Sequence, residues 1–296
     1  MIKTTIPQEE IMGRGHLACQ GCGGALAMRY ALKALGREAC LTIPACCWSV
    51  IDGPFPHSAV GVPMFHTAFE TAASTAAGIK AAYEIKGAND ISVVAWAGDG
   101  GTYDIGIQAL SGAAERNDDL IYICYDNEAY MNTGIQRSGA TPQRAWTTTT
   151  PVDRPKDEPK KDLVSIMAAH RIPYIATGTV AYPEDLVKKL TKAREIRGTR
   201  FFLLLAPCPA GWKSRPEDTI RLSRLAVQSR VFPLLEIEGG RIWRLTREVK
   251  KPAAVIEYLK LQGRFRHLSE EDVKEIQRTV DTEWEFLRSR LYSNQG

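Results

Sequence analysis

Two apolar, β-rich runs, each followed at once by polar or glycine residues, constrain the fold of this chain more than any other feature. Residues 91–97 are followed by Gly-Asp-Gly-Gly at 98–101, and residues 120–125 are followed by Asp-Asn at 126–127. Continuous apolar runs of this kind are typical of parallel strands that are buried on both faces. Parallel strands end at one edge of an open α/β sheet, where such folds bind their ligands. The pattern therefore predicts an α/β fold, with a mostly parallel sheet and helices on both faces.

The residues that follow these two runs have the chemistry of a site for Mg²⁺ and a diphosphate. Carboxylate and amide oxygens are hard donors that suit Mg²⁺, and this ion usually bridges to phosphates. Glycine lets the backbone approach a diphosphate closely. A strand-to-helix turn with Asp99 as an N-cap would explain the first segment alone, but not the second segment at its distance from the first. The residues expected to form this site are Gly98, Asp99, Gly100, Gly101 and Asn127, and their spacing resembles the diphosphate-binding domain of thiamine-diphosphate enzymes.

The cysteines indicate a second metal site. Their number is seven, and an odd count argues against a fully paired disulfide framework. Cys19 and Cys22 form a Cys-x-x-Cys pair beside glycines, while Cys47 and Cys208 each lie in a proline-containing loop after a predicted strand. On spacing alone, four such thiolates can hold zinc or a [4Fe–4S] cluster equally well. Two further cysteines fall at or within apolar strands and are expected to be small buried side chains, Cys40 and Cys124.

Several motifs together resemble the thiamine-binding beta subunits of the 2-oxoacid:ferredoxin oxidoreductase family. The most specific is Asn-Glu-Ala-Tyr-Met-Asn-Thr-Gly at 127–134. The resemblance extends over most of the chain and implies a thiamine-diphosphate-binding domain with an iron–sulfur cluster over residues 1–230. Residues 231–296 are then expected to be a C-terminal extension that packs on this domain or on a partner subunit. The matching motifs lie at 15–24, 44–49, 98–106, 126–134, 138–142 and 258–265.

The resemblance also implies roles for single residues. Asn132 matches the active-site asparagine that faces the substrate. The Mg²⁺ ligands would be Asp99, the side chain of Asn127 and the carbonyl of Ala129. The thiamine cofactor would be contacted by Gly98, Gly100, Gly101, Cys47, Trp48, Asn127 and Thr133, and the [4Fe–4S] cluster would be held by Cys19, Cys22, Cys47 and Cys208. Cys46 is adjacent to Cys47, and the match of Cys-Trp-Ser at 47–49 to the family's loop favours Cys47.

By the same resemblance, the expected activity is oxidative decarboxylation of a 2-oxoacid, with pyruvate favoured. Electrons would pass through the cluster to ferredoxin, and the acyl group would pass to coenzyme A. In this superfamily the glutamate that activates thiamine lies on a pyrimidine-binding domain, for which a chain of 296 residues has no room. The implied partners are therefore a pyrimidine-domain (alpha) subunit, a gamma subunit, a ferredoxin-like (delta) subunit and ferredoxin. Related subunits act on branched-chain 2-oxoacids, 2-oxoglutarate or oxalate.

Other functions remain open on the sequence. The chain could be a non-oxidative thiamine decarboxylase with structural zinc at Cys19 and Cys22, an electron-transfer module without thiamine, or an assembly subunit with a vestigial site. The net charge of +4 is spread along the chain and forms no Lys/Arg cluster of the kind that binds nucleic acid. The sequence shows neither an apolar run of membrane-spanning length nor a secretory leader, so a cytoplasmic location is expected.

The pattern also predicts local elements. We expect helices at 68–83, 103–115 and 185–195, an exposed loop at 151–161, a hairpin of 234–238 with 241–245, and a polar helix over 269–291 that Ser269 caps.

Overall fold

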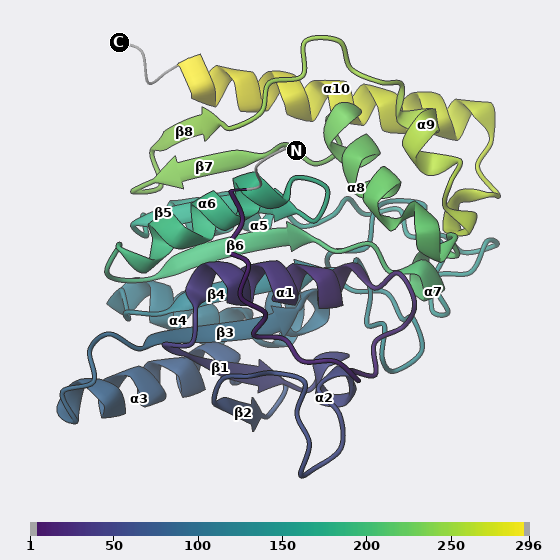
Figure 1. The fold of residues 1–296 in the computed structure, drawn as a ribbon. Helices are drawn as coiled ribbons and strands as arrows, with labels where there is room; N and C mark the ends of the chain where they lie inside the picture. The colour runs from purple at the N-terminus through teal and green to yellow at the C-terminus, as the bar shows by residue number, and fades with distance from the viewer. Residues whose placement is uncertain (1–4, 293–296) are drawn as a thin grey trace.

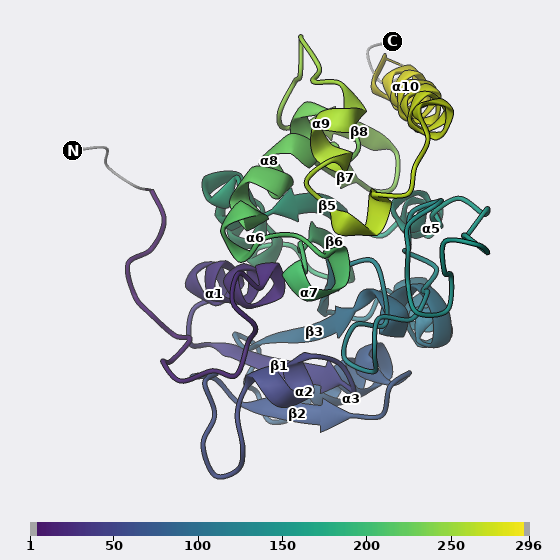
Figure 2. The same ribbon diagram turned by 90° about the vertical axis from the view of Figure 1, so that its right-hand side faces the viewer.

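In the computed structural model, residues 5–292 are described, and they form one eight-stranded sheet between two layers of helices (Figures 1 and 2). The strand order is β2-β1-β3-β4-β6-β5-β7-β8. The first six strands in this order pair in parallel, whereas β7 pairs antiparallel with β5 and with β8. The strands are β1 (Ala39–Pro44), β2 (Met64–Thr67), β3 (Ser92–Gly98), β4 (Ile121–Asp126), β5 (Tyr174–Thr179), β6 (Arg200–Leu205), β7 (Leu235–Glu238) and β8 (Ile242–Leu245). The predicted fold class is therefore confirmed.

Helices cover both faces of the sheet, because its central strands are apolar on both sides and must be shielded from water. Every residue of β1, β4, β5 and β6 is buried. On one face α1, α2 and α6 pack against the strands, and on the other face α3, α4, α5 and α10 do, while α8 packs against α9 and α9 against α10. The helices are α1 (Gly23–Leu35), α2 (Trp48–Ile51), α3 (Ala72–Ile85), α4 (Ile107–Arg116), α5 (Leu163–Ala169), α6 (Pro183–Arg194), α7 (Pro209–Trp212), α8 (Thr219–Gln228), α9 (Val255–Leu259) and α10 (Glu270–Tyr292).

The helix predicted at 103–115 is two elements in the structure. A short π-helical turn, η1 (Gly100–Ile105), precedes α4. A Cβ added at Gly106 would lie 2.1 Å from the carbonyl oxygen of Gly101, so only glycine allows this wide turn to close on itself. The other predicted helices occur close to their expected positions, as α3 and α6.

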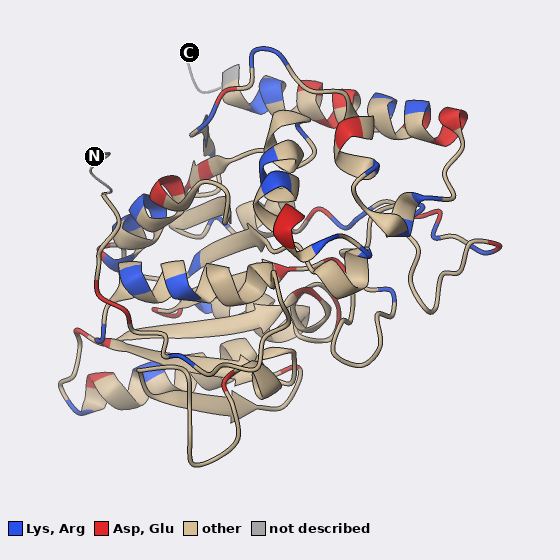
Figure 3. Ribbon diagram, turned by 45° about the vertical axis from the view of Figure 1, so that its right-hand side comes forward, with Lys and Arg blue, Asp and Glu red and all other residues tan. Residues whose placement is uncertain are grey.

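The C-terminal part contains the expected hairpin and capped helix. β7 and β8 pair antiparallel, and β7 adds to β5, so that this segment extends the main sheet. The Ser269 hydroxyl accepts a bond from the Asp272 N–H (3.2 Å), and the Asp272 carboxylate accepts one from the Ser269 N–H (2.9 Å), which is a capping box. Lys and Arg alternate with Asp and Glu along α10 (Figure 3). The division of the chain at residue 230 stays a prediction.

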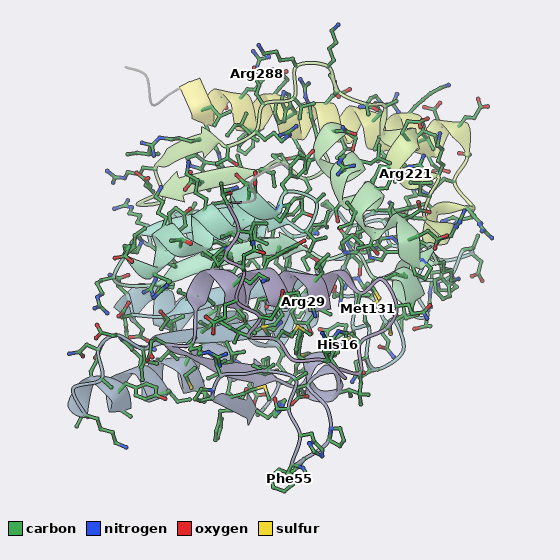
Figure 4. The ribbon with its side chains drawn as sticks, viewed as in Figure 1. His16, Arg29, Phe55, Met131, Arg221 and Arg288 are labelled. Atoms are coloured by element: carbon green, nitrogen blue, oxygen red, sulfur yellow. The ribbon has the colours of Figure 1, made fainter. Side chains whose placement is uncertain are left out.

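Among the described residues, no helix combines the length and the apolar character needed to cross a bilayer. One large apolar side chain stands clear of the fold, that of Phe55, which is 97% exposed at the tip of the loop between α2 and β2 (Figure 4).

Candidate functional site

The polar residues singled out in the sequence lie at the carboxyl edge of the sheet. Cys47 follows β1, Asp99 follows β3, Asn127 follows β4, and Cys208 follows β6. These four strands are parallel neighbours, and Gly98 at the end of β3 pairs with Tyr125 near the end of β4. The loops after the strands therefore meet at one edge, on the side where α2 and α7 are seen in Figure 1.

Asp99 is fully buried, and its carboxylate accepts a bond from the hydroxyl of Ser138 (2.5 Å). Burial raises the pKa of Asp99 well above its usual range, and the nearby carboxylate of Asp126 raises it further. A buried carboxylate is costly unless a cation or further donors compensate its charge. The Asp99 carboxylate thus needs a cation nearby. The sequence also allowed Asp99 to be a simple helix N-cap, but its side chain makes no capping hydrogen bond to η1.

Three oxygen atoms converge beside Asp99. The amide oxygen of Asn127 lies 2.8 Å from Oδ1 of Asp99 and 3.0 Å from the carbonyl oxygen of Ala129. With its nitrogen at this position the Asn127 amide donates to both neighbours, and with its oxygen there the three acceptors can surround a cation. Neighbouring ligands of an octahedral Mg²⁺, with bonds of about 2.1 Å, lie about 3.0 Å apart. The donor set of Asp99, Asn127 and Ala129 therefore fits this ion.

The glycines of the turn after β3 allow the 127–134 loop to pack directly on it. A Cβ added at Gly100 would lie 2.4 Å from the ring of Tyr130, and one added at Gly101 would lie 3.2 Å from the ring of Phe69. The Tyr130 hydroxyl donates to Asp104 (2.8 Å), which fixes the ring over the turn. Gly100 thus has a packing role, in addition to the contact with a diphosphate that the sequence predicts.

Three of the candidate cluster cysteines begin helices. Cys22, Cys47 and Cys208 are the N-cap residues of α1, α2 and α7. The sulfur of Cys22 accepts a bond from the N–H of Ala25, and that of Cys208 accepts one from the N–H of Gly211, both at 3.4 Å. Backbone N–H groups at a helix N-terminus favour negative charge, so these positions suit thiolates.

Cys19, Cys22, Cys47 and Cys208 are close enough to affect one another electrostatically. Burial raises the pKa of Cys47, and the charges of Cys46, Cys208, Cys22 and Cys19 raise it further. The pKa of Cys208 rises to about 11, first through burial and then through Cys22 and Cys19. Within residues 5–292, however, no three His, Cys, Asp or Glu side chains converge as a ready metal site. The four thiols are thus near one another, but they do not converge on a common point where a metal could bind all of them.

Cys46 has a different environment from its neighbour. Its thiol is hydrogen-bonded to the side chain of Tyr125, and burial is the main cause of its raised pKa. Cys46 and Cys47 both pack against the core layer under α1 and α6, so the contact with Tyr125 is what distinguishes Cys46. The thiols predicted to be core side chains, Cys40 and Cys124, are both buried.

Three residues of the expected cofactor site differ in their exposure. Asn132 and Thr133 are exposed on the 127–134 loop, and the Thr133 hydroxyl donates to Gln136 (2.6 Å). Trp48 is 0% exposed and packs edge-on against Trp96 in the core, so it presents no surface to a cofactor. The prediction that Trp48 contacts thiamine diphosphate has no counterpart in this arrangement, because its side chain is part of the hydrophobic layer below α1.

A buried charge network next to the site was not found from the sequence. Glu128 accepts bonds from Lys160 (3.0 Å) and Arg264 (2.5 Å), and Asp126 accepts one from Lys160 (2.5 Å). Lys160 lies in the segment predicted as an exposed loop, 151–161, a prediction that is only partly correct because Lys156 is buried and Lys160 is half-buried. The only feature of the sequence that pointed to this network was the run of charged residues among prolines at 151–161. That run did not indicate which residues Lys160 would pair with.

Comparison with known proteins identifies the family. The model of the thiamine pyrophosphate enzyme C-terminal TPP-binding domain matches residues 49–204, a segment that contains Asp99 and Asn127 and excludes Cys19, Cys22, Cys47 and Cys208. The chain is 52% identical over 295 residues to ketoisovalerate oxidoreductase subunit VorB of Pyrococcus furiosus, covering 97% of this chain and 95% of the relative. It is 49% identical over 297 residues to pyruvate synthase subunit PorB of Methanocaldococcus jannaschii, covering 97% of this chain and 99% of the relative.

A solved structure has a similar fold. It is the 2-oxoglutarate:ferredoxin oxidoreductase from Magnetococcus marinus with 2-oxoglutarate, coenzyme A and succinyl-CoA bound, with a TM-score of 0.60 at 21% identity, covering 75% of this chain and 81% of that chain. The near-complete matches to curated subunits, together with the thiamine-binding domain model, show that this chain belongs to the thiamine-diphosphate-binding beta subunits of the 2-oxoacid:ferredoxin oxidoreductase family.

Proposed function

We propose that this chain binds Mg²⁺ and thiamine diphosphate at the edge formed by Asp99, Asn127 and Ala129, and a [4Fe–4S] cluster through Cys19, Cys22, Cys47 and Cys208. The observation that supports the proposal most is the proximity of the two donor sets at one edge of the sheet. When bound, thiamine diphosphate supplies the electron sink for decarboxylation, and the cluster accepts electrons.

The residues of this chain then have separate tasks. Asp99, Asn127 and the Ala129 carbonyl supply hard oxygen donors for the cation on the diphosphate. The four cysteines hold the electron acceptor next to the cofactor. Asn132, which is exposed on the same loop as the metal donors, is available to orient the 2-oxoacid. Zinc in the cysteine site would leave the electrons without an acceptor, because zinc has no redox chemistry.

Pyruvate is the 2-oxoacid that we propose first, with coenzyme A as the acyl acceptor and ferredoxin as the electron acceptor. A branched-chain 2-oxoacid is the second candidate. In Pyrococcus furiosus the ketoisovalerate oxidoreductase subunit is 52% identical to this chain, whereas the pyruvate synthase subunit is 43% identical. The relatives are named as subunits, so the chain acts within a multi-subunit enzyme, for which we propose pyrimidine-domain, gamma and ferredoxin-like partners.

The assembled complex, purified without oxygen, tests this proposal. Reduction of ferredoxin should require a 2-oxoacid, coenzyme A and thiamine diphosphate, and pyruvate should give the highest kcat/KM in a panel with ketoisovalerate, 2-oxoglutarate and oxalate. A higher value for ketoisovalerate would identify the second candidate as the substrate. Release of CO₂ without reduction of ferredoxin, from a protein that contains zinc and no iron, would refute the oxidative reaction.

A further inference from the structure

We infer that Arg264, Glu128 and Trp212 are positioning residues that hold the turn carrying Asn127 and Ala129 in the geometry required for the metal. The inference rests on the proposed function, because it concerns the same turn. It adds a role for the C-terminal segment, since Arg264 lies 136 residues after Glu128.

Glu128 stands between the two residues that donate to the metal, and it has a left-handed backbone conformation with φ of 69°. A residue other than glycine rarely adopts this conformation and keeps it only where its surroundings enforce it. The side chain is 3% exposed, and its carboxylate accepts bonds from Arg264 (2.5 Å) and Lys160 (3.0 Å). Two cationic side chains therefore pair with the same buried carboxylate, which fixes the Glu128 side chain in place.

Trp212 holds the same turn from the other side. Its indole N–H donates to the backbone carbonyl of Asn127 (2.8 Å), and its side chain is fully buried. The guanidinium of Arg264 lies 4.1 Å from the centre of the Trp212 ring, within the range of a cation–π contact. Arg264 therefore contacts both groups that hold the turn, the carboxylate of Glu128 and the ring of Trp212.

Arg264 is itself fixed by its surroundings. Its side chain donates to Gln262 from Nε (2.9 Å) and from a terminal nitrogen (2.7 Å), and its carbonyl oxygen accepts a bond from the N–H of Trp146 (3.0 Å). A planar guanidinium can stack on an indole with its face while its edge donates to acceptors, whereas a lysine ammonium has no flat face to stack.

The contacts fix the backbone that carries the Asn127 amide and the Ala129 carbonyl, which lie 3.0 Å apart. Without these contacts the left-handed conformation at Glu128 would relax, and binding of the metal would then have to restore it. Fixing a site in its bound geometry strengthens binding because less ordering is needed when the ligand arrives. Affinity for Mg²⁺ and thiamine diphosphate is therefore the property that these residues should control.

The test uses Trp212→Phe and Arg264→Lys in the assembled complex. Trp212→Phe removes the N–H and keeps a ring, and Arg264→Lys keeps the charge and removes the planar fork. We expect the dissociation constant of thiamine diphosphate, from equilibrium dialysis at fixed Mg²⁺, to rise about tenfold in each, the size of one or two lost hydrogen bonds. The electron paramagnetic resonance spectrum of Mn²⁺ bound in place of Mg²⁺ should change as well, while kcat at saturating cofactor stays within about twofold.

Arg230→Lys is the matched control, because Arg230 lies 4.3 Å from the ring of Trp284 in a similar stack away from the turn. An equal loss of affinity in this control would show general loosening of the fold and would overturn the inference. Unchanged affinity and an unchanged Mn²⁺ spectrum in both Trp212→Phe and Arg264→Lys would also overturn it, provided that Asp99→Ala binds the cofactor weakly. Normal binding by Asp99→Ala would instead refute the proposed metal site.

Discussion

The thiols of Cys22 and Cys208 each lie at the N-terminus of a helix, and this position would stabilise a cluster that they bind. A [4Fe–4S] cluster with four thiolates carries net negative charge, which N–H groups directed at sulfur stabilise. Each of these two thiols already has such an N–H at 3.4 Å. Cys47 is the N-cap residue of α2, but its sulfur accepts no capping hydrogen bond from the N–H groups of that helix.

Substitution of single cysteines separates ligands from neighbours. Cys22→Ser, Cys47→Ser and Cys208→Ser should each lose most of the iron and all reduction of ferredoxin, because each removes a proposed ligand. Cys46→Ser is the control, since its thiol faces Tyr125, and it should keep its iron. Iron content and visible absorbance measure the loss of the cluster, and a ferredoxin-reduction assay of the assembled complex measures the loss of activity. Loss of iron in Cys46→Ser with full iron in Cys47→Ser would reverse the assignment of the third ligand.

β7 joins the sheet through charged contacts as well as backbone pairing. Glu236 accepts bonds from the Tyr174 hydroxyl (2.5 Å) and from Lys192 on α6 (2.9 Å), and Lys192 also bonds Glu238 (2.9 Å). Burial acts to raise the pKa of Glu236, but these partners outweigh it, so the pKa is lowered. The hydrogen bond from Lys192 is the main cause of the lowered pKa of Glu238.

The lowered pKa values fix the sign of a pH effect. A carboxylate whose pKa is lower in the folded protein contributes stability above its unfolded pKa, near 4.3, and loses it as the pH falls through the folded value. Glu236→Gln should therefore lower the free energy of unfolding by about 1 kcal/mol at pH 7, and the difference from the parent should shrink below about pH 4.

Urea unfolding of both proteins at pH 7 and at pH 3 measures this difference in the free energy of unfolding. Glu257→Gln is the control, because Glu257 pairs with Lys260 on an exposed helix surface (2.6 Å) and should change stability little at either pH. A constant difference for Glu236→Gln from pH 7 to pH 3 would contradict the expectation.

In the proposed function, the whole molecule provides one half of an active site. The proposed diphosphate donors and cluster ligands lie at the edge of the one sheet that residues 5–292 form, and these residues contain no second sheet that could provide a pyrimidine-binding half. We therefore expect the purified chain to be inactive with every 2-oxoacid, and activity to return when it is combined with a pyrimidine-domain subunit. Thiamine-dependent reduction of a dye by the chain alone, driven by a 2-oxoacid, would contradict this expectation.

The extent to which the sequence predicted the molecule differs between its parts. The strands β3 and β4 and the edge at which they end could be predicted, because continuous apolar runs and the polar residues after them are local signals. The ion pair of Glu128 with Arg264 could not, because a pairing across 136 residues leaves no periodic trace. Trp48 was assigned to the cofactor through the family resemblance, whereas an apolar ring at the start of a short helix is equally suited to the core where it lies.

The common edge of β1, β3, β4 and β6 has a consequence for the timing of catalysis. These strands pair directly and are almost wholly buried, so the groups at their ends belong to one rigid body. In the proposed function, the first electron transfer would then need little reorganisation of the protein and would not wait for a domain to close. Its rate should be insensitive to solvent viscosity, whereas the later transfer to a diffusing ferredoxin should slow as viscosity rises.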